Sequence, residues 1–185
     1  MIGIELPPKY VMDSLLDIYL NSVHWFMAVF HETSFQSEYD AISATGLACR
    51  RQFRFLMLLL VVLSMGARYA IAQNGSFFLE VDLDLLQSKF LTKVRENMDN
   101  VLDEGEIESV QICILLSSHY LYHGRPNLAF ITLGTGVKSA QAMGLHNEAT
   151  WTQASQTTVE IRRRVWLALY VFDRYVLLAC DDVRR

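Results

Sequence analysis

The sequence AQAMGLH at residues 140–146, followed by TTVEIRRRVWLALYVFDR at residues 157–174, decides the fold of this chain. Together the two segments predict a helix end, a loop and a second helix. Gly144 stands where a helix commonly ends on a residue with positive φ. Thr157 can accept an amide hydrogen bond as an N-cap, and Glu160 three residues later completes a capping box. We therefore expect a new helix to begin directly after this cap.

The second helix carries one apolar stripe and one basic run. The apolar residues recur at three- and four-residue spacing, which is typical of a helix face buried against other helices. They are Ile161, Val165, Leu169, Phe172 and Val176. Arg162, Arg163 and Arg164 are consecutive, and three consecutive residues fan across about 200° of a helix. The three arginines therefore cannot all share one solvent face.

The arginines are expected to pair within the protein. Glu160 lies one turn before Arg164, an arrangement in which an exposed ion pair adds about 0.2–0.5 kcal/mol. Arg162 can lie along Trp166, one turn further on, in a cation–π contact. The remaining arginine is expected to reach across to another helix. A basic run can also bind nucleic acid or direct nuclear import, but internal pairing is the better interpretation here.

These residues together resemble the fungal-specific transcription factor domain, the middle homology region of binuclear zinc-cluster regulators. The matching residues are Ala140, Gly144, Leu145, His146, Arg162, Arg163, Arg164, Val165, Trp166, Asp173 and Arg174. Their spaced combination is more specific than any one piece of it. Residues 22–35, 109–111 and 124–125 resemble earlier parts of the same domain, so the resemblance covers most of the chain.

The resemblance implies a regulatory domain, residues 1–185, that controls transcription in the nucleus. In the family, this helical region follows a DNA-binding cluster of six cysteines, and it is associated with control of activity and sometimes with effector response. Zinc and DNA are thus expected only at an N-terminal cluster that this chain lacks. The implied partners are a small-molecule effector or a transcriptional co-regulator. The family pattern continues beyond Arg174 toward a Gly-Arg-Pro-like segment, so we expect the domain to be incomplete at its C-terminus.

Length and composition set independent limits. The chain has 185 residues, of which 52% are hydrophobic, so it can bury a sizeable core, and we expect a single domain. With 16 basic and 20 acidic residues, its formal net charge of −4 gives no electrostatic footprint for nucleic acid. Cys49, Cys113 and Cys180 are isolated, which favours neither a disulfide framework nor a zinc cluster. Without a secretory signal at the N-terminus, these features indicate an intracellular protein.

The strongest hydrophobic signal is a run of nine apolar residues at 55–63. It is far shorter than the 18 or so residues needed to span a bilayer, so we interpret it as part of a core helix and expect no membrane association. This helix is predicted at residues 47–73. A turn is predicted at residues 74–76, with the apolar residues 77–79 packed under it.

The remaining segments also have helical spacing of their apolar residues. The predicted helices are one opened by Pro7 and Pro8, one capped by Ser34 and closed by Gly46, one running from near Asp82 to Gly105, and a pair at residues 106–122 and 128–143. Gly124 suits a C-cap and Pro126 a first turn, so the pair should form an antiparallel hairpin. The sequence thus predicts an all-α fold of stacked antiparallel helices.

Patterns for catalysis, cofactor binding, metal binding or direct DNA binding do not emerge, so we predict no enzyme activity. His119 and His123 have the spacing of a helical metal-ligand pair, but no third ligand accompanies them. Ser117 and Ser118 lack the elbow motif of a nucleophile. The glycines at residues 134–136 lack the preceding strand of a phosphate-binding loop. Because each glycine weakens a helix by about 1 kcal/mol relative to alanine, another helix is expected to cross there.

Two function classes stay open at this point. One is a regulatory domain of a fungal zinc-cluster transcription factor, and the alternative is a stand-alone helical scaffold for protein interaction. A helical enzyme is a third, weaker reading, because no acid–base pair, nucleophile elbow or metal set is present. The DNA sequence upstream of Met1 separates the first two, since six in-frame cysteines there would support a regulator.

Overall fold

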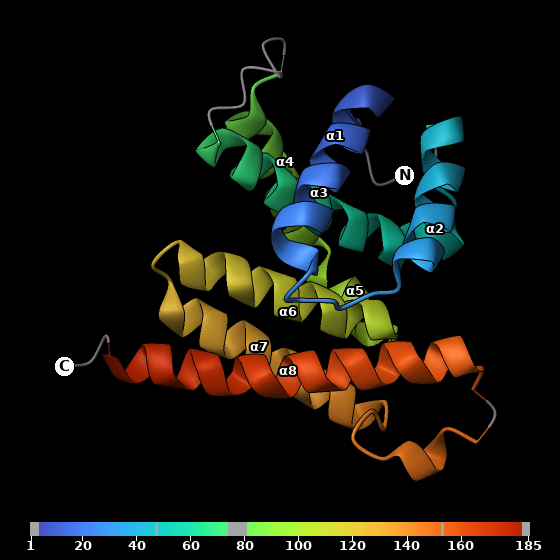
Figure 1. Ribbon diagram of the computed structural model, residues 1–185, viewed down its shortest axis with the longest axis vertical. Coiled ribbons are helices and arrows are strands. Elements are labelled where there is room, and N and C mark those ends of the chain that lie inside the picture. Colours follow the sequence, from blue (N-terminus) through green and yellow to red (C-terminus); the bar gives the residue numbers. More distant parts are fainter. Residues whose placement is uncertain (1–3, 47, 74–80, 153, 183–185) are drawn as a thin grey trace. The chain divides into compact units, whose positions relative to one another are not determined.

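Regular structure in the described part of the chain consists of helices. The computed structural model describes residues 4–46, 48–73, 81–152 and 154–182, with side chains described as far as residue 176. Within these ranges the chain forms eight α-helices and no strand, which confirms the predicted all-α fold (Figure 1). The helices are α1 (Lys9–Tyr19), α2 (Glu32–Thr45), α3 (Phe53–Ala72), α4 (Leu83–Glu96), α5 (Met98–Asp103), α6 (Ile107–Tyr122), α7 (Pro126–Ala142) and α8 (Gln156–Asp182).

The helices divide into two compact units. Unit 1 comprises residues 1–27 and 33–99, and unit 2 comprises residues 28–32 and 100–185. Unit 1 therefore contains α1 to α4, whereas unit 2 contains α6 to α8. The predicted turn and apolar cluster at residues 74–79 lie outside the described residues.

The core of unit 1 is α3. Every residue from 55 to 67 is buried, as expected for a core helix, and each fully buried large apolar side chain contributes about 1.5–3 kcal/mol. By length and composition alone, residues 50–72 could cross a membrane, with a mean hydropathy of 2.0, but 78% of the apolar window is buried inside the protein. The helix begins later than predicted, because Arg50–Gln52 form a 3-10 turn.

α1 crosses α3 at Gly66. A Cβ built at Gly66 would lie 2.1 Å from the carbonyl oxygen of Leu15, so only glycine lets the two backbones approach this closely. The apolar stripe predicted for α1 is buried, and it continues through a π-helical turn at Leu20–His24, in which Val23 is fully buried. This crossing could not be predicted from the sequence, because the close approach depends on a contact between distant segments.

α2 docks through apolar residues at helical spacing. Phe35, Tyr39 and Ile42 are buried, and the Tyr39 hydroxyl donates a hydrogen bond of 2.5 Å to Oδ1 of Asp13 on α1. The helix begins two residues before the predicted cap at Ser34. Its end is confirmed, since Gly46 has a φ of 64°.

The helix predicted from near Asp82 to Gly105 is two helices. The first begins at the predicted place, where Asp82 caps α4 by accepting a hydrogen bond of 2.9 Å from the Leu85 amide. The break occurs at Asn97, whose side-chain amide donates to the Lys93 carbonyl oxygen at 2.8 Å. This side-chain bond competes with the helical pattern, so α4 ends and α5 restarts.

The hairpin of α6 and α7 in unit 2 is confirmed. Gly124 has a φ of 67° and Pro126 is the first residue of α7. At Gly136 a Cβ would lie 2.8 Å from the Cβ of Cys113 on α6, so close crossing requires glycine there. At Gly134 nothing lies within 4 Å, so the expected crossing is wrong at that position among the described residues. Only one of the two glycines faces a helix.

Candidate functional site

α7 ends on the left-handed residue that the sequence predicts. Gly144 has a φ of 71°. The Leu145 amide donates to the Ala140 carbonyl oxygen at 2.9 Å, and the Gly144 amide donates to the Gln141 carbonyl oxygen at 3.0 Å. These two bonds form a Schellman motif, which satisfies carbonyl groups at a helix end. Leu145 is buried, so the chain leaves α7 with an apolar anchor.

The segment after this turn folds back through Trp151. Its ring is only 7% exposed, and its indole Nε1–H donates to the Gly144 carbonyl oxygen at 3.1 Å. The guanidinium carbon of Arg162 on α8 lies 5.6 Å from the centre of the Trp151 ring. The predicted cation–π partner of Arg162 was Trp166, and that prediction is wrong. The loop places Trp151 against the guanidinium, which a pairing rule within one helix cannot anticipate.

Arg163 joins α8 to a short 3-10 helix, Glu148–Thr150. Its Nε donates to Oε1 of Glu148 at 2.9 Å and its Nη2 donates to Oε2 at 2.7 Å, which is a bidentate ion pair. The hydrogen bond from Arg163 holds the pKa of the Glu148 carboxyl below its ordinary value. One arginine was expected to reach beyond its own helix, and Arg163 does so, although its partner lies in the connecting segment.

Arg164 pairs within α8, as predicted, with a distance of 2.7 Å from its Nε to Oε1 of Glu160. The predicted cap at Thr157 is wrong. Ser155 caps the helix, because its Oγ accepts a hydrogen bond of 3.1 Å from the Thr158 amide. Ser155 Oγ also lies 2.9 Å from the Thr158 hydroxyl, a second contact that favours the earlier serine. The helix therefore begins before Thr157, and Glu160 serves an ion pair instead of a capping box.

Gly144, Glu148, Trp151, Arg162 and Arg163 together form a surface cluster that we call the clasp. It holds the connecting segment against the first turns of α8 through one indole hydrogen bond, one cation–π contact and one bidentate ion pair. All five residues lie in unit 2. Chemically the clasp has no nucleophile and no acid–base pair. Glu148 neutralises Arg163, and the charge of Arg162 lies against the Trp151 ring. Its geometry is that of a structural support.

The other residues of the predicted signature lie outside the clasp. The exposed His146 ring is 6.2 Å from the half-buried Trp166 ring. The Arg174 guanidinium lies 5.4 Å from the centre of the Tyr170 ring on the same helix. Asp173 is half-buried on α8. The signature residues thus fall into two groups. One group holds the connecting segment against α8, and the other makes contacts outside the clasp.

Sequence reasoning missed three residues of this region: Glu148, Trp151 and Ser155. Glu148 is separated from its partner Arg163 by a loop whose path no helical spacing describes. Ser155 was passed over for the capping-box pattern that begins at Thr157. One signal was available for Trp151, because it is the only large apolar residue in the otherwise polar segment 146–156.

The candidates for chemistry on α6 make structural contacts. The His123 Nδ1–H donates to the His119 carbonyl oxygen at 2.6 Å, and the two imidazole rings are 3.9 Å apart. The Ser117 hydroxyl donates to the Ala129 carbonyl oxygen on α7 at 2.7 Å, so it fastens the hairpin. In the described ranges, no three His, Cys, Asp or Glu side chains gather as metal ligands.

The described cysteines do not fit a zinc cluster. Cys49 is exposed in unit 1 and Cys113 is buried in unit 2. Burial raises the pKa of the Cys113 thiol to about 12, so it stays protonated at neutral pH and is a poor metal ligand.

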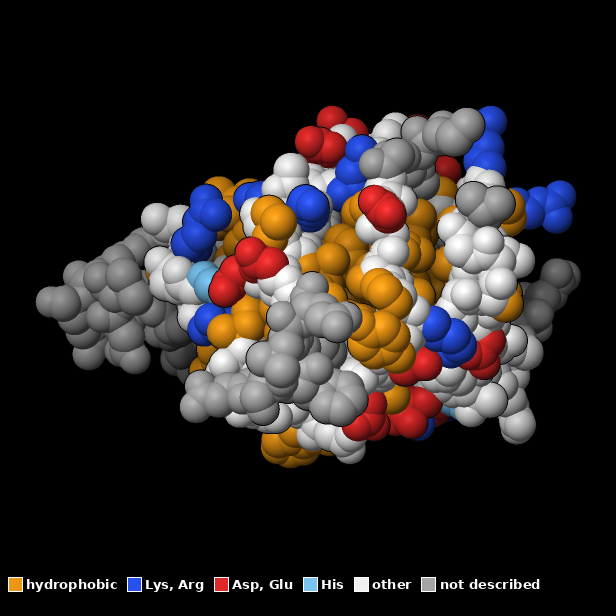
Figure 2. Space-filling view, turned by 90° about the horizontal axis from the view of Figure 1, so that it is seen from above, with side chains coloured by type: hydrophobic (Ala, Val, Ile, Leu, Met, Phe, Trp, Pro, Cys, Tyr) orange, Lys and Arg blue, Asp and Glu red, His pale blue; other side chains and the backbone are white. Residues whose placement is uncertain are grey.

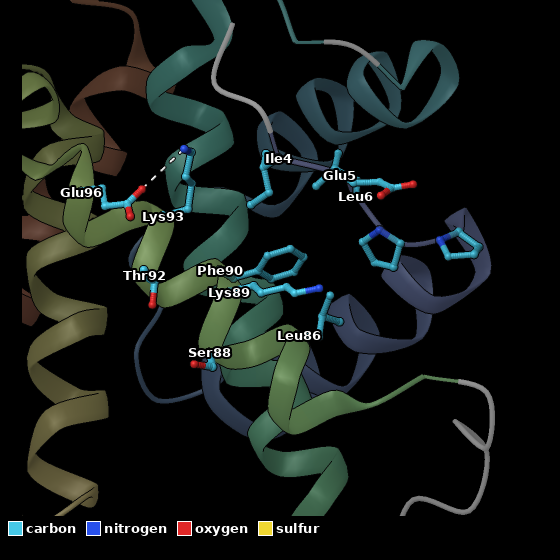
Figure 3. A pocket seen from close by; sticks show the side chains of 12 residues that line it. Ile4, Glu5, Leu6, Leu86, Ser88, Lys89, Phe90, Thr92, Lys93 and Glu96 are labelled. Atoms are coloured by element: carbon cyan, nitrogen blue, oxygen red, sulfur yellow. Dashed lines mark hydrogen bonds and ion pairs between the residues drawn. The ribbon is translucent and has the colours of Figure 1, made fainter.

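A cavity lies in unit 1, between α4 and the segment that leads into α1. Its volume is about 620 Å³. Ile4, Leu86 and Phe90 give it apolar walls, and Lys89 and Lys93 line it one turn apart on α4 (Figure 3). Lys93 Nζ is 3.5 Å from Oε2 of Glu96. This cavity combines an apolar surface with charged groups, as ligand sites do.

Apolar side chains also remain on the surface. Figure 2 shows hydrophobic side chains on the surface among charged ones. In unit 2, Leu167, Tyr170, Val171 and Tyr175 are exposed on α8, at positions i, i+3, i+4 and i+8. Helical spacing places them along one side of α8.

Comparison with known proteins gives a consistent result. The family model described as "Fungal specific transcription factor domain" matches residues 16–180. The chain is 26% identical over 176 residues to "Transcription factor FBD3" of Gibberella moniliformis, an alignment that covers 94% of this chain and 23% of the relative. It is 28% identical over 182 residues to "Transcription factor yanR" of Aspergillus niger, covering 88% and 22%.

A third relative is "Thiamine repressible genes regulatory protein thi1" of Schizosaccharomyces pombe, 23% identical over 174 residues, with 92% of this chain and 22% of the relative covered. The chain therefore spans less than a quarter of the length of these relatives. No solved structure matches the chain.

Proposed function

Because the chain belongs to the family of the fungal-specific transcription factor domain, we propose that residues 1–185 are the regulatory domain of a zinc-cluster transcription factor. The relatives are named as transcriptional regulators, and they are much longer than this chain. In the proposed role, the domain controls transcription in the nucleus in response to an effector or a co-regulator. It has no catalytic function.

The observation that carries this proposal is the use of the signature arginines. Arg162 lies on Trp151, and Arg163 and Arg164 are bound to glutamates. Contacts to DNA phosphates need cationic side chains that are available to neutralise phosphate charge. Arg162 and Arg163 instead hold the connecting segment against α8, and Arg164 pairs within the helix, which supports a structural part in a regulatory domain.

Regulation by such a domain needs two helical packings of similar free energy. A ligand or partner that binds one packing better than the other shifts the population toward it, and attached segments respond to the change. The cavity beside α4 is a candidate place for a small effector, because it lies between two elements of unit 1 whose packing a ligand can alter. A co-regulator is the other candidate partner.

Zinc and specific DNA contacts are assigned to a cluster outside this chain. Support comes from the chain's formal net charge of −4 and from the burial of Cys113, which raises the pKa of its thiol. Specific readout requires an element that enters a groove and reaches base edges. In the proposal, this chain regulates an attached DNA-binding segment and reads no sequence itself.

A stand-alone scaffold for protein interaction is the second candidate. The exposed apolar residues Leu167, Tyr170 and Val171 on α8 favour it, because contiguous apolar surface commonly marks a protein-binding face. Reading the transcript upstream of Met1 discriminates the two: six in-frame cysteines there support the regulator, and a stop codon directly upstream supports the scaffold.

A reporter assay tests regulation itself. The full chain is placed between a heterologous DNA-binding domain and a constitutive activation segment in a fungal cell, and compared with the same fusion lacking residues 1–185. We expect reporter output to change with the chain present, and to vary with growth conditions. Identical output under every condition would contradict a regulatory role.

A binding assay tests the absence of DNA readout. The purified chain is titrated against a pool of random duplexes at about 150 mM salt, where specific binders keep high affinity and phosphate contacts alone weaken. We expect no motif to be selected. Enrichment of one sequence that is lost on replacing residues 162–164 would make those arginines a recognition element.

A further inference from the structure

The cavity in unit 1 has the size and the walls of a small-molecule site. Its volume of about 620 Å³ falls within the range of about 300–1,000 Å³ that is usual for ligand pockets. One wall is α4, and the other is the segment of residues 4–8 that leads into α1. A ligand bound here would contact two separate elements of unit 1.

The apolar part of the cavity is built from both elements. Phe90 is only 1% exposed and forms a rigid floor, and Leu86 and Ile4 are half-buried beside it. Figure 3 shows the Phe90 ring and the Ile4 side chain facing each other across the open space. Such a space suits one aromatic ring or a branched hydrocarbon.

The charged part of the cavity is asymmetric. Lys93 is half-buried and paired with Glu96, at 3.5 Å from Nζ to Oε2. Lys89, one turn earlier, forms no ion pair or hydrogen bond with any described residue, Glu5 included. In Figure 3 it runs beside the Phe90 ring, and its Nζ points away from the Lys93–Glu96 pair. The Lys89 ammonium group, which lies next to the apolar floor, is therefore available to bind a ligand.

We propose that this cavity binds a small carboxylic acid with an apolar body. The carboxylate pairs with Lys89 Nζ, and the hydrocarbon lies between Phe90 and Leu86 on α4 and Ile4 on the opposite wall. A charge-assisted hydrogen bond of this kind is about twice as strong as a neutral one, and the apolar contact adds burial of the ligand's ring. A phosphate ester fits less well, because the Lys89 ammonium, which has no partner among the described residues, offers too few donors for its oxygens.

The position of the site links it to the packing of unit 1. Residues 4–8 run directly into α1, and Pro8 is the N-cap of that helix. α1 in turn lies on α3 at Gly66. A carboxylate ligand that joins residues 4–8 to α4 thus favours one arrangement of α1 and α4. That the ligand acts as an effector rests on the regulatory function proposed above, whereas its binding does not.

The test measures binding of 4-fluorophenylacetate to the full chain by ¹⁹F NMR line broadening. We expect the acid to bind, and the uncharged 4-fluorophenylacetamide to bind about tenfold more weakly, since about 1.4 kcal/mol of charge-assisted bonding is lost. Equal binding of acid and amide, tighter binding of 4-fluorophenethylamine, or no binding of the acid would each overturn the proposal.

Variants of the chain locate the site. Lys89→Met should weaken binding of the acid about tenfold, and Lys89→Arg should retain it, because the cation is kept. Lys138→Met is the matched control, since Lys138 is also an exposed helical lysine but lies on α7 in unit 2. Leu86→Trp should abolish binding by filling the cavity; if it does not fold, the two Lys89 variants still decide. Unchanged binding in Lys89→Met would overturn the proposal.

The reporter fusion separates the two proposals. In one outcome, the wild-type protein binds the acid in vitro, and the reporter responds to growth conditions but not to the acid. The site and the regulatory function are then both supported. Only the role of this ligand as an effector is contradicted. If reporter output responds to no condition, the proposed regulatory function is contradicted, whereas the proposed binding site is not. Loss of reporter response in Lys89→Met, with Lys138→Met unaffected, supports both.

Discussion

Unit 1 and unit 2 hold their helices by different means. In unit 1, α3 is buried on all sides from residue 55 to residue 67, and the α1 backbone lies directly on it at Gly66. In unit 2, the segment between α7 and α8 is held by the surface contacts of the clasp, in which Arg163 and Glu148 are each exposed. The glycine, arginine and tryptophan residues of the signature around the clasp are in unit 2, whereas the α3 core of unit 1 consists of ordinary apolar residues.

This difference shows that the residues that stabilise the fold most are not those that identify the family in the sequence. Burial of large apolar side chains contributes a few kcal/mol each, whereas exposed ion pairs contribute about 0–1 kcal/mol. Leucines and valines of a core occur in every globular protein, so they mark no family. Three adjacent arginines with a tryptophan have specific partners and therefore form a recognisable pattern. The following substitutions test this contrast, beginning with the largest expected effect.

Gly66→Ala should destabilise unit 1 most. Its Cβ would lie 2.1 Å from the Leu15 carbonyl oxygen, and backbone atoms cannot turn aside as a side chain can. We expect a loss of about 4 kcal/mol, above the usual cost of overpacking, measured by urea denaturation followed by circular dichroism.

The matched control for this substitution is Gly134→Ala, on the open face of α7. With nothing within 4 Å, it should stabilise the protein by about 0.5–1 kcal/mol through the better helix propensity of alanine. Equal stability of the Gly66 and Gly134 variants would contradict the close crossing of α1 and α3.

Trp151→Ala should be the most damaging change in the clasp. It removes a ring that is 7% exposed, the hydrogen bond to Gly144 and the surface on which Arg162 lies. We expect a loss of about 3 kcal/mol, at the lower end for buried tryptophan because the ring sits near the surface. Trp151→Phe isolates the indole hydrogen bond and should cost about 1 kcal/mol. If Trp166→Ala proved the more damaging alanine variant, the assignment of the anchor to Trp151 would be wrong.

Gly136→Ala should have an intermediate effect in unit 2. The new methyl group would meet the Cβ of Cys113 at 2.8 Å, so α6 and α7 must separate slightly. A cost of about 1–2 kcal/mol is expected in thermal or urea unfolding, less than for Gly66→Ala because the blocking atom belongs to a side chain. A larger loss than in Gly66→Ala would reverse the proposed ranking of the two crossings.

Glu148→Gln should have the smallest effect and a defined pH dependence. The native pKa of Glu148 is lowered by its hydrogen bond from Arg163, so its contribution is complete above the unfolded-state pKa and disappears as pH falls through the native value. The melting temperatures of wild type and Glu148→Gln should differ slightly at neutral pH, and converge in acid or in high salt. Glu38→Gln on α2 is the exposed control and should show no such convergence.

The sequence predicted best what local chemistry decides. Gly144 and Gly124 were placed correctly because positive φ at a helix end is a property of a few adjacent residues. The pair of Glu160 and Arg164 followed from helical spacing alone. These features need no knowledge of the rest of the fold.

The sequence predicted poorly what contacts between distant segments decide. Gly66 and Gly136 meet other helices, whereas Gly134 does not, and all three lie inside helices. The partner of Arg162 depends on the path of a loop. The break at Asn97 depends on competition between a side-chain hydrogen bond and the continuation of a helix, which spacing of apolar residues does not reveal. The cavity beside α4 has no sequence pattern, because it arises where two segments meet.

Because Cys113 is buried, its chemical modification can be used to measure the opening of unit 2. Its thiol is buried against α7 and its pKa is raised to about 12, so an alkylating reagent can modify it only when α6 and α7 separate. Cys49 is exposed and available to the reagent at all times. With Cys180 replaced by serine, the ratio of the two alkylation rates reports how often unit 2 opens in the native protein. A partner that tightens unit 2 would slow the modification of Cys113 and leave Cys49 unchanged.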